Sequence, residues 1–337
     1  MEKRLTTQMQ KNLLIIATGG TIASNKTKKG LSPTSTGDDL ISQIAGLPED
    51  CRLHVLQLMN IDSTNMKPDG WMAIQKAIAE NYDTYDGFVV LHGTDTLDYT
   101  AAALSYLIQN SPKPIVITGS QKPMSHPYTD AKINLYQSIL YALDSGSCDV
   151  SVVFGGRVIA GTRSRKQKTR SFDGFTSMNF PLLARFQDEE IIRVFPTDKP
   201  FGPVRFYDHL EGNILSIKLI PGMTPDFFRL LKEQYQGIIL EAYGLGGIPN
   251  FDRSYEEAIF DWIHSGKILV ITTQVPEEGC DFSVYEVGHI YHNHPLILEA
   301  GNMTLETISA KLMWALGQTK ELGKIRELFY RRINFDC

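Results

Sequence analysis

The sequence predicts an α/β protein with two lobes, each a mainly parallel sheet flanked by helices. Short apolar segments alternate with longer segments in which apolar residues recur at helical spacing, which is the pattern of β-α-β units. The chain has 337 residues, 42% of them hydrophobic, which is enough for about two cores. A stretch at 196–213 with three prolines and two glycines separates two such alternating regions, so we expect a linker there.

The first region, residues 1–195, is predicted to form an N-terminal α/β domain. Apolar runs predict its strands at 13–17, 53–58, 87–91, 114–118 and 150–154. Helical spacing predicts its helices at 68–82, 97–109 and 130–143, and the first of them opens with a proline in first-turn position.

The second region, residues 214–337, is predicted to form a C-terminal α/β domain by the same criteria. Its strands are expected at 214–220, 237–242 and 268–273. Its helices are expected at 225–234, 255–265 and 304–316.

Charge and cysteine content restrict the partners that we expect. The formal net charge is -5, from 33 basic and 38 acidic side chains mixed along the chain, which favours a small soluble substrate and no nucleic acid. The four cysteines lie far apart, with no spacing that indicates a disulfide framework or a zinc site. We therefore expect reduced thiols in a cytoplasmic protein. The apolar run at 13–17 is too short for a signal-peptide core, and no run has membrane-spanning length.

Two threonine-rich turns follow predicted strands. The first strand ends in Thr-Gly-Gly-Thr at 18–21, and the third ends in His-Gly-Thr-Asp-Thr at 92–96. Ligands of open α/β sheets bind beyond the carboxyl ends of the strands, and glycines let the backbone approach a ligand closely. These turns therefore carry the candidate reactive hydroxyls.

A threonine hydroxyl needs a positioned base and an electrostatic cradle before it attacks an amide carbonyl. The basic segment at 161–168, which follows the fifth predicted strand, supplies candidate lysines. Buried beside Asp95, such an amine would shuttle protons to Thr94.

Each motif also has a structural interpretation. The Gly-Gly-Thr turn is compatible with phosphate binding or simple packing, and the motif at 92–96 with a helix N-cap. The cations at 163–170 are typical of a solvated loop or an anion-binding patch. His289, His292 and His294 form a loose cluster, but no carboxylate or cysteine spacing supports a metal site, so we predict none.

The motifs taken together resemble those of bacterial L-asparaginases, most closely of the cytoplasmic type I branch. The resemblance rests on Ala-Thr-Gly-Gly-Thr-Ile at 17–22 and Leu-His-Gly-Thr-Asp-Thr at 91–96. It extends to Thr-Gly-Ser-Gln at 118–121 and Tyr-Gly-Leu-Gly at 243–246, and so into both lobes. It implies an L-asparagine amidohydrolase that needs no cofactor.

The resemblance also implies the catalytic residues. Thr21 corresponds to the acylated nucleophile of the family. Thr94, Asp95 and Lys166 correspond to a second catalytic triad, with Lys166 fixed by alignment through Phe-Asp-Gly-Phe at 172–175.

Substrate-binding residues and assembly are implied in the same way. Ser63 matches the serine that binds the α-carboxylate, Thr64 adjoins it, and Asp95 would hold the α-amino group. Gly20 and Gly93 are expected to face the substrate through their backbone. The family commonly builds homotetramers from tight dimers, with active sites at subunit seams.

Five positions depart from the family pattern. Leu31 stands where the family has a tyrosine in a mobile loop after the nucleophile. Asn65 replaces a usual aspartate, and Gly247 replaces an asparagine that often reaches the neighbouring subunit's site. Arg165 and Val275 replace a threonine and a cysteine that bind a second asparagine in some type I members. We therefore expect altered turnover or substrate preference, the same reaction class and no allosteric response.

Three other functions remain open. A glutaminase-asparaginase of mixed specificity differs by one methylene in its substrate. The asparaginase-like subunit of an archaeal-type tRNA-dependent amidotransferase uses the same threonine but carries an extra domain before it, whereas twenty residues precede Thr21 here. A non-catalytic amino-acid sensor would retain the fold without turnover.

Overall fold

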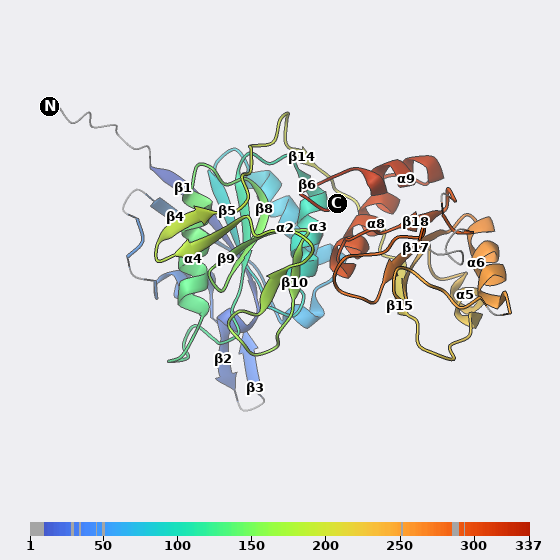
Figure 1. The fold of residues 1–337 in the computed structure, drawn as a ribbon. Helices are drawn as coiled ribbons and strands as arrows, with labels where there is room; N and C mark the ends of the chain where they lie inside the picture. The colour runs from blue at the N-terminus through green and yellow to red at the C-terminus, as the bar shows by residue number, and fades with distance from the viewer. Residues whose placement is uncertain are drawn as a thin grey trace. The chain divides into compact units, whose positions relative to one another are not determined.

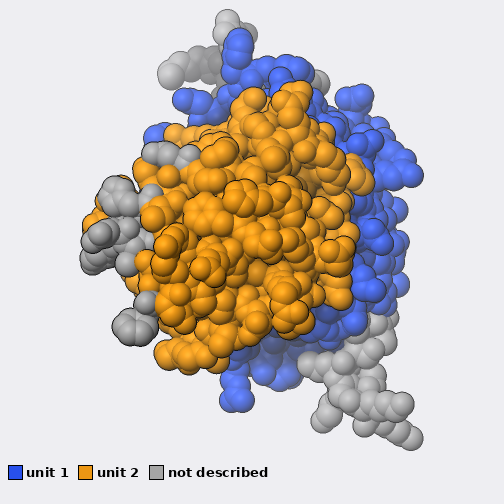
Figure 2. All heavy atoms as spheres, turned by 90° about the vertical axis from the view of Figure 1, so that its right-hand side faces the viewer, with its two compact units in different colours: residues 1–177, 181–208 blue, residues 178–180, 209–337 orange. Residues whose placement is uncertain are grey.

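The computed structural model describes residues 10–27, 30–33, 35–44, 46–48, 51–250, 252–284, 290–292 and 294–337, with the backbone alone for 25–27 and 30–33. The chain divides into two compact units (Figure 2). Unit 1 comprises Met1–Ser177 and Pro181–Asp208, and unit 2 comprises Met178–Phe180 and His209–Cys337. The step from Asp208 to His209 lies within 196–213, whose assignment as a linker stays a prediction.

Unit 1 is built on an eight-stranded sheet of order β13-β12-β9-β8-β7-β5-β1-β4. Figure 1 labels five of its strands, β1, β4, β5, β8 and β9. Its parallel part is β4 (Cys51–Ile61), β1 (Lys11–Gly19), β5 (Gly87–Leu91), β7 (Pro114–Thr118) and β8 (Asp149–Phe154). Its antiparallel extension is β9 (Arg157–Ala160), β12 (Ala184–Gln187) and β13 (Glu190–Arg193). All five predicted strands of this region therefore occur, and they are neighbours in the sheet.

The main helices of unit 1 are α2 (Pro68–Asn81), α3 (Leu97–Leu107) and α4 (Ala131–Leu143). Both α3 and α4 pack on β7 and β8, and every residue of β5 and β7 is buried. Strands covered in this way read as continuous apolar runs, which is why they were visible in the sequence. Short elements complete the unit: η1 (Thr21–Ala23), α1 (Gly37–Ile41), η2 (Ser63–Asn65), and the strand pairs β2–β3 (Ser24–Thr27, Gly30–Pro33), β6–β14 (Ile108–Gln109, Arg205–Phe206) and β10–β11 (Ser164–Lys166, Phe175–Ser177).

The predicted helix at 97–109 was wrong at its end. Ile108 adopts extended dihedral angles, φ -131° and ψ 100°, and stops α3. Strand β6, which begins at Ile108, pairs antiparallel with β14. A β-branched residue favours extended backbone, and the partner strand lies almost a hundred residues away in the chain, so helical spacing alone did not show this stop.

Unit 2 contains a four-stranded parallel sheet of order β15-β16-β17-β18. Its elements are β15 (Ile214–Lys218), α5 (Asp226–Leu231), β16 (Gly237–Ala242), α6 (Ser254–His264), β17 (Ile268–Thr273), β18 (Ile297–Glu299), α8 (Leu305–Gln318) and α9 (Leu322–Tyr330). The three predicted strands and three predicted helices are present, α5 is shorter than predicted, and β18 and α9 were not predicted. The predicted fold class, two lobes of mainly parallel sheet flanked by helices, is confirmed.

No helix within the described residues is both long enough and apolar enough to cross a membrane.

Candidate active site

Two glycine turns meet at the carboxyl ends of the neighbouring strands β1 and β5. Gly19 and Gly20 have φ values of 106° and 78°, which favour glycine. The N–H group of Gly20 donates to Ile61 O over 2.9 Å at the end of β4. A Cβ atom on Gly20 would overlap the backbone of Gly93, so this contact requires glycine. The two threonine-rich turns of the sequence are thereby brought together.

Ser63 links the end of β4 to the glycine turn that follows β5. Its hydroxyl accepts a hydrogen bond from Asp95 N at 3.2 Å, and its carbonyl accepts one from Thr96 Oγ1 at 2.8 Å. A Cβ atom on Gly93 would stand 2.5 Å from Ser63 Oγ, so the serine is pressed against the glycine turn. The adjoining Thr64 is exposed and donates its hydroxyl hydrogen to Asp62 Oδ1 at 2.8 Å.

Lys166 reaches this cluster from β10, which among the described strands pairs only with β11. Its Nζ donates to Thr94 Oγ1 at 2.8 Å and to Asp95 Oδ1 at 2.5 Å. The lysine side chain is 15% exposed, and that of Asp95 is 55% exposed. The interpretation of this basic stretch as a solvated loop was wrong for its first part, where Arg163 is buried and Lys166 binds the site.

Thr21 directly follows Gly20, opens η1 and is half-buried. The hydroxyl of Ser24 donates to Gly20 O at 2.9 Å and holds this turn. Thr21 thus follows a residue that touches Gly93, while Thr94 follows Gly93 itself. After η1 the chain forms the β2–β3 pair, in which Leu31 lies opposite Lys26. The side chain of Leu31, predicted to replace the lid tyrosine, lies outside the described residues.

A buried polar chain behind the site was not predicted. His92 Nδ1 lies 2.7 Å from Gly93 O, which can only accept, so this nitrogen carries the proton. Nε2 then accepts from Thr100 Oγ1 at 2.9 Å, and Thr100 accepts from Trp71 Nε1 at 2.9 Å. Burial lowers the pKa of His92 from 6.5 to about 4, so the ring is neutral. Thr100 and Trp71 lie apart from His92 in the chain and meet it only on folding, which is why sequence patterns did not show this chain.

The interpretation of the motif at 92–96 as a helix N-cap was incomplete. Thr96 does occupy the N-cap position of α3, but its side chain makes no capping bond. It donates instead to Ser63 O and so links η2 to the turn after β5.

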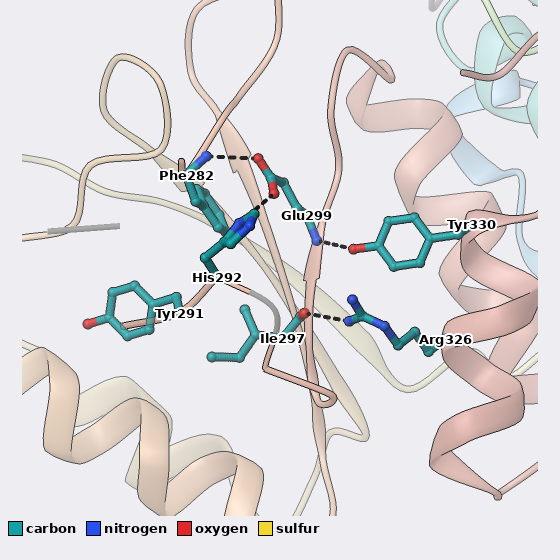
Figure 3. A pocket seen from close by; sticks show the side chains of 7 residues that line it. All are labelled: Phe282, Tyr291, His292, Ile297, Glu299, Arg326 and Tyr330. Carbon is teal, nitrogen blue, oxygen red and sulfur yellow. Dashed lines mark hydrogen bonds and ion pairs between the residues drawn. The ribbon is translucent and has the colours of Figure 1, made fainter. Parts of the chain in front are cut away.

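Of the histidines considered in the sequence analysis, His292 lines a cavity of about 280 Å³ in unit 2 (Figure 3). His292 Nδ1 is 3.8 Å from Glu299 Oε2, while His294 Nδ1 accepts from Leu296 N. Glu299 Oε1 also accepts from Phe282 N at 2.9 Å, which ties a loop to β18. His289 lies outside the described residues, and among those described no three metal-ligating side chains come together.

Comparison with protein-family models decides the relationship of the chain. The model described as "Asparaginase, N-terminal" matches residues 12–197, and "Glutaminase/Asparaginase C-terminal domain" matches residues 213–329. The chain belongs to the asparaginase family. The family that the motifs resemble is thereby confirmed, and the chain is an asparaginase-family hydrolase.

Individual relatives agree with this assignment. The chain is 38% identical to the L-asparaginase of Thermococcus kodakarensis over 95% of its own length and 97% of that protein. The solved structure of that thermostable enzyme superposes with a TM-score of 0.91, at 36% identity, over 96% of this chain and 98% of the other. L-asparaginase 1 of Escherichia coli K12 is 31% identical, with 95% and 96% coverage.

A third relative belongs to one of the alternative functions. A glutamyl-tRNA(Gln) amidotransferase subunit of Metallosphaera sedula is 32% identical over 93% of this chain and 74% of that protein. Its lower coverage and identity make it a poorer match than the Thermococcus asparaginase.

Proposed function

We propose that this protein hydrolyses L-asparagine to L-aspartate and ammonia, with Thr21 as the nucleophile and no cofactor. The observation that carries the proposal is the meeting of Thr94, Asp95 and Lys166 with the Gly20 turn at one end of the large sheet. A hydroxyl, a carboxylate and an amine within hydrogen-bonding distance form a proton relay of the kind that a threonine nucleophile requires.

The reaction proceeds in two acyl-transfer steps. Thr21 Oγ bonds to the side-chain amide carbon of asparagine, its proton passes through the relay to the leaving nitrogen, and the C–N bond breaks to release ammonia. Water then adds to the resulting β-aspartyl ester, and its cleavage returns the proton to Thr21 and frees aspartate. Lys166, held by Thr94 and Asp95, carries the protons between these steps.

Backbone N–H groups stabilise the oxyanion that forms in each step, and removal of one such donor from an enzyme typically costs about 3 kcal/mol. Two turns offer such groups, the Gly19–Gly20 turn and the turn around Thr94. Gly20 N already donates to Ile61 O, and Asp95 N donates to Ser63 Oγ. We therefore assign the role to the N–H group of Thr94.

The substrate's charged ends fit the remaining groups. Asp95 gives one carboxylate oxygen to Lys166 and is half exposed, so it is open to the α-ammonium group. Ser63 lies beside Asp95 N and faces the α-carboxylate, with Thr64 next to it. Gly20 and Gly93 pack together without side chains, and we assign their backbone to contact with the reacting amide.

The decisive experiment measures ammonia release from L-asparagine, L-glutamine and D-asparagine by the purified protein and by its Thr21→Ala variant. We expect release from L-asparagine that disappears in the variant. If the protein releases no ammonia but asparagine stabilises it against thermal unfolding, the protein is a sensor and not an enzyme.

Mixed activity on glutamine is the second candidate. It is favoured by the match of residues 213–329 to a model shared by glutaminases and asparaginases. Discrimination against one extra methylene commonly amounts to about 10- to 200-fold in kcat/KM. If kcat/KM for asparagine and kcat/KM for glutamine are nearly equal in the same assay, the mixed function is established.

Assembly and location complete the proposal. By similarity to the family, the protein forms a cytoplasmic homotetramer built from tight dimers. All four cysteines are free thiols, as expected in a reducing compartment. A monomer measured by light scattering at micromolar concentration would contradict the proposed assembly.

A further inference from the structure

We propose that Asp98 is a positioning residue that fixes the amine of Lys166 against Thr94 and Asp95. The proposal rests on the proposed function, since it assigns a role within the same proton relay. Asp98 belongs to neither sequence motif and is the second residue of α3, after the turn that carries Thr94 and Asp95.

The carboxylate of Asp98 connects the backbone of Lys166 to helix α3. Oδ2 accepts the backbone N–H of Lys166 at 2.8 Å, and Oδ1 accepts the N–H of Tyr99, within α3, at 3.1 Å. Asp98 thus connects β10, which bears Lys166, to α3, which follows directly after Thr94 and Asp95 in the chain.

The burial of Asp98 distinguishes it from an ordinary first-turn acid. Acidic residues are common at helix amino ends because the helix dipole favours them, and there they are usually exposed. Asp98 is only 3% exposed, and taking a carboxylate out of water is costly unless hydrogen bonds compensate. The bond to Lys166 N, between residues 68 positions apart, provides such compensation.

Lys166 depends on this support because its strand is short and is not part of the large sheet. Strand β10 is three residues long, belongs with β11 to a two-stranded sheet and lies outside the large sheet. A lysine side chain has many rotamers, so the place of its amine depends on where its backbone is held. A displacement of about 1 Å in a catalytic group commonly costs about 100-fold in rate.

Three substitutions separate geometry from charge. Asp98→Asn keeps one oxygen to accept the N–H of Lys166 but loses the charge and the second acceptor. Asp98→Glu keeps the charge but moves it by one methylene, and Asp98→Ala removes the acceptor. We expect kcat to fall about 10- to 100-fold in Asp98→Ala and Asp98→Glu with little change in KM, and to stay within about threefold in Asp98→Asn. The Asn and Glu pair decides the question even when the Ala variant does not fold. A full kcat in Asp98→Glu with a loss in Asp98→Asn would overturn the proposal.

Asp149→Ala is the matched control. Asp149 Oδ1 also accepts a backbone N–H, that of Ser111, at 2.8 Å, but it lies at the amino end of β8, away from the strand ends that form the site. This control should lose stability and keep kcat. An equal loss of kcat in Asp149→Ala would mean that general destabilisation explains the Asp98 variants.

A second readout does not depend on turnover. The rate of reductive methylation of Lys166, followed by mass spectrometry of its peptide, reports how firmly the amine is held. It should rise in Asp98→Ala and Asp98→Glu and stay at the parent rate in Asp98→Asn. If the parent enzyme releases no ammonia, the proposed function fails while this measurement still tests the positioning role. An unchanged methylation rate in all variants would refute that role.

Discussion

Two lysine–aspartate pairs of almost equal length occur in the two units. In unit 1, Lys166 Nζ lies 2.5 Å from Asp95 Oδ1, and in unit 2, Lys311 Nζ lies 2.6 Å from Asp336 Oδ2. The first pair is partly open to water and also binds a threonine hydroxyl. The second is fully buried, with Lys311 donating also to Arg331 O. Two pairs of almost equal length therefore differ in their access to solvent. The open pair is the one that we propose for proton transfer, and the buried pair is structural.

The buried pair fixes the end of the chain. Lys311 lies on α8, and Asp336 Oδ1 also accepts the N–H of Ile333, so the carboxylate closes the turn that precedes Cys337. A buried ion pair contributes little beyond a well-packed apolar pair, but removal of one partner leaves an uncompensated charge. Its role in unit 2 is thus to hold one arrangement of the C-terminal segment.

The largest expected effect is on activity, from Lys166→Met. This change removes the amine that bridges Thr94 and Asp95, and loss of a positioned proton-transfer group typically lowers kcat by about 100- to 10,000-fold. Steady-state ammonia release and urea unfolding measure kcat and stability separately. Lys168→Met is the control, because Lys168 follows closely in the chain and forms an exposed pair with Asp173. Similar kcat losses in both variants would remove the distinction between Lys166 and its neighbours.

Next in size is the effect of Asp336→Ala on stability. The variant strands Lys311 without its carboxylate, which commonly costs about 3–5 kcal/mol in the free energy of unfolding. Urea unfolding checks this, and the folded fraction should keep its kcat. The exposed pair Lys320–Glu211 of the same unit provides the control, since Lys320→Ala should cost less than about 1 kcal/mol. A specific loss of kcat in Asp336→Ala would show that the buried pair serves the active site.

The fold could be predicted where its signals were local. Strands β5 and β7 are buried along their whole length and so appear as apolar runs, and α2, α3 and α4 show helical spacing. The antiparallel strands β12 and β13 are short and partly exposed, so they lacked such a run. Pairs such as β6–β14 depend on partners far along the chain, which periodicity cannot identify.

In the candidate site, too, contacts between residues far apart in the chain could not be predicted. The glycine turns and Thr94 stood out because residue type and position after a strand carry chemical meaning. Lys166 was one of several cations until alignment with the family selected it. Asp98 and Lys311 showed no signal, because their partners, Lys166 N and Asp336, are defined only by the folded structure. Residues that support a site are therefore less predictable than those that perform its chemistry.

The buried imidazole of His92 makes the stability of unit 1 depend on pH. His92 is held neutral, with its pKa lowered from 6.5 to about 4 by burial. Because the unfolded chain binds the proton more tightly, the stabilising contribution is complete above pH 6.5 and is lost as the pH falls toward 4, by about 3 kcal/mol in all. Urea unfolding at pH 7 and pH 4.5 should show a loss about 2–3 kcal/mol greater in the parent than in His92→Gln.

His294 of unit 2 is the matched control for that measurement. Burial also lowers its pKa, but its side chain is only partly buried, so His294→Gln should change the pH dependence much less. The same pH dependence in the parent and in His92→Gln would mean that the buried ring does not carry the effect.

The smallest expected effect concerns another lysine–aspartate pair, Lys232–Asp261, which links the end of α5 to α6 at 2.8 Å. Its side chains are 24% and 65% exposed, so water screens the attraction that the short distance suggests. Lys232→Ala should lower the free energy of unfolding by less than about 1 kcal/mol. That difference should shrink between about 0.05 M and about 0.5 M salt in urea unfolding, because salt screens exposed charges. A loss as large as that of Asp336→Ala would show that distance, and not burial, determines what such a pair contributes.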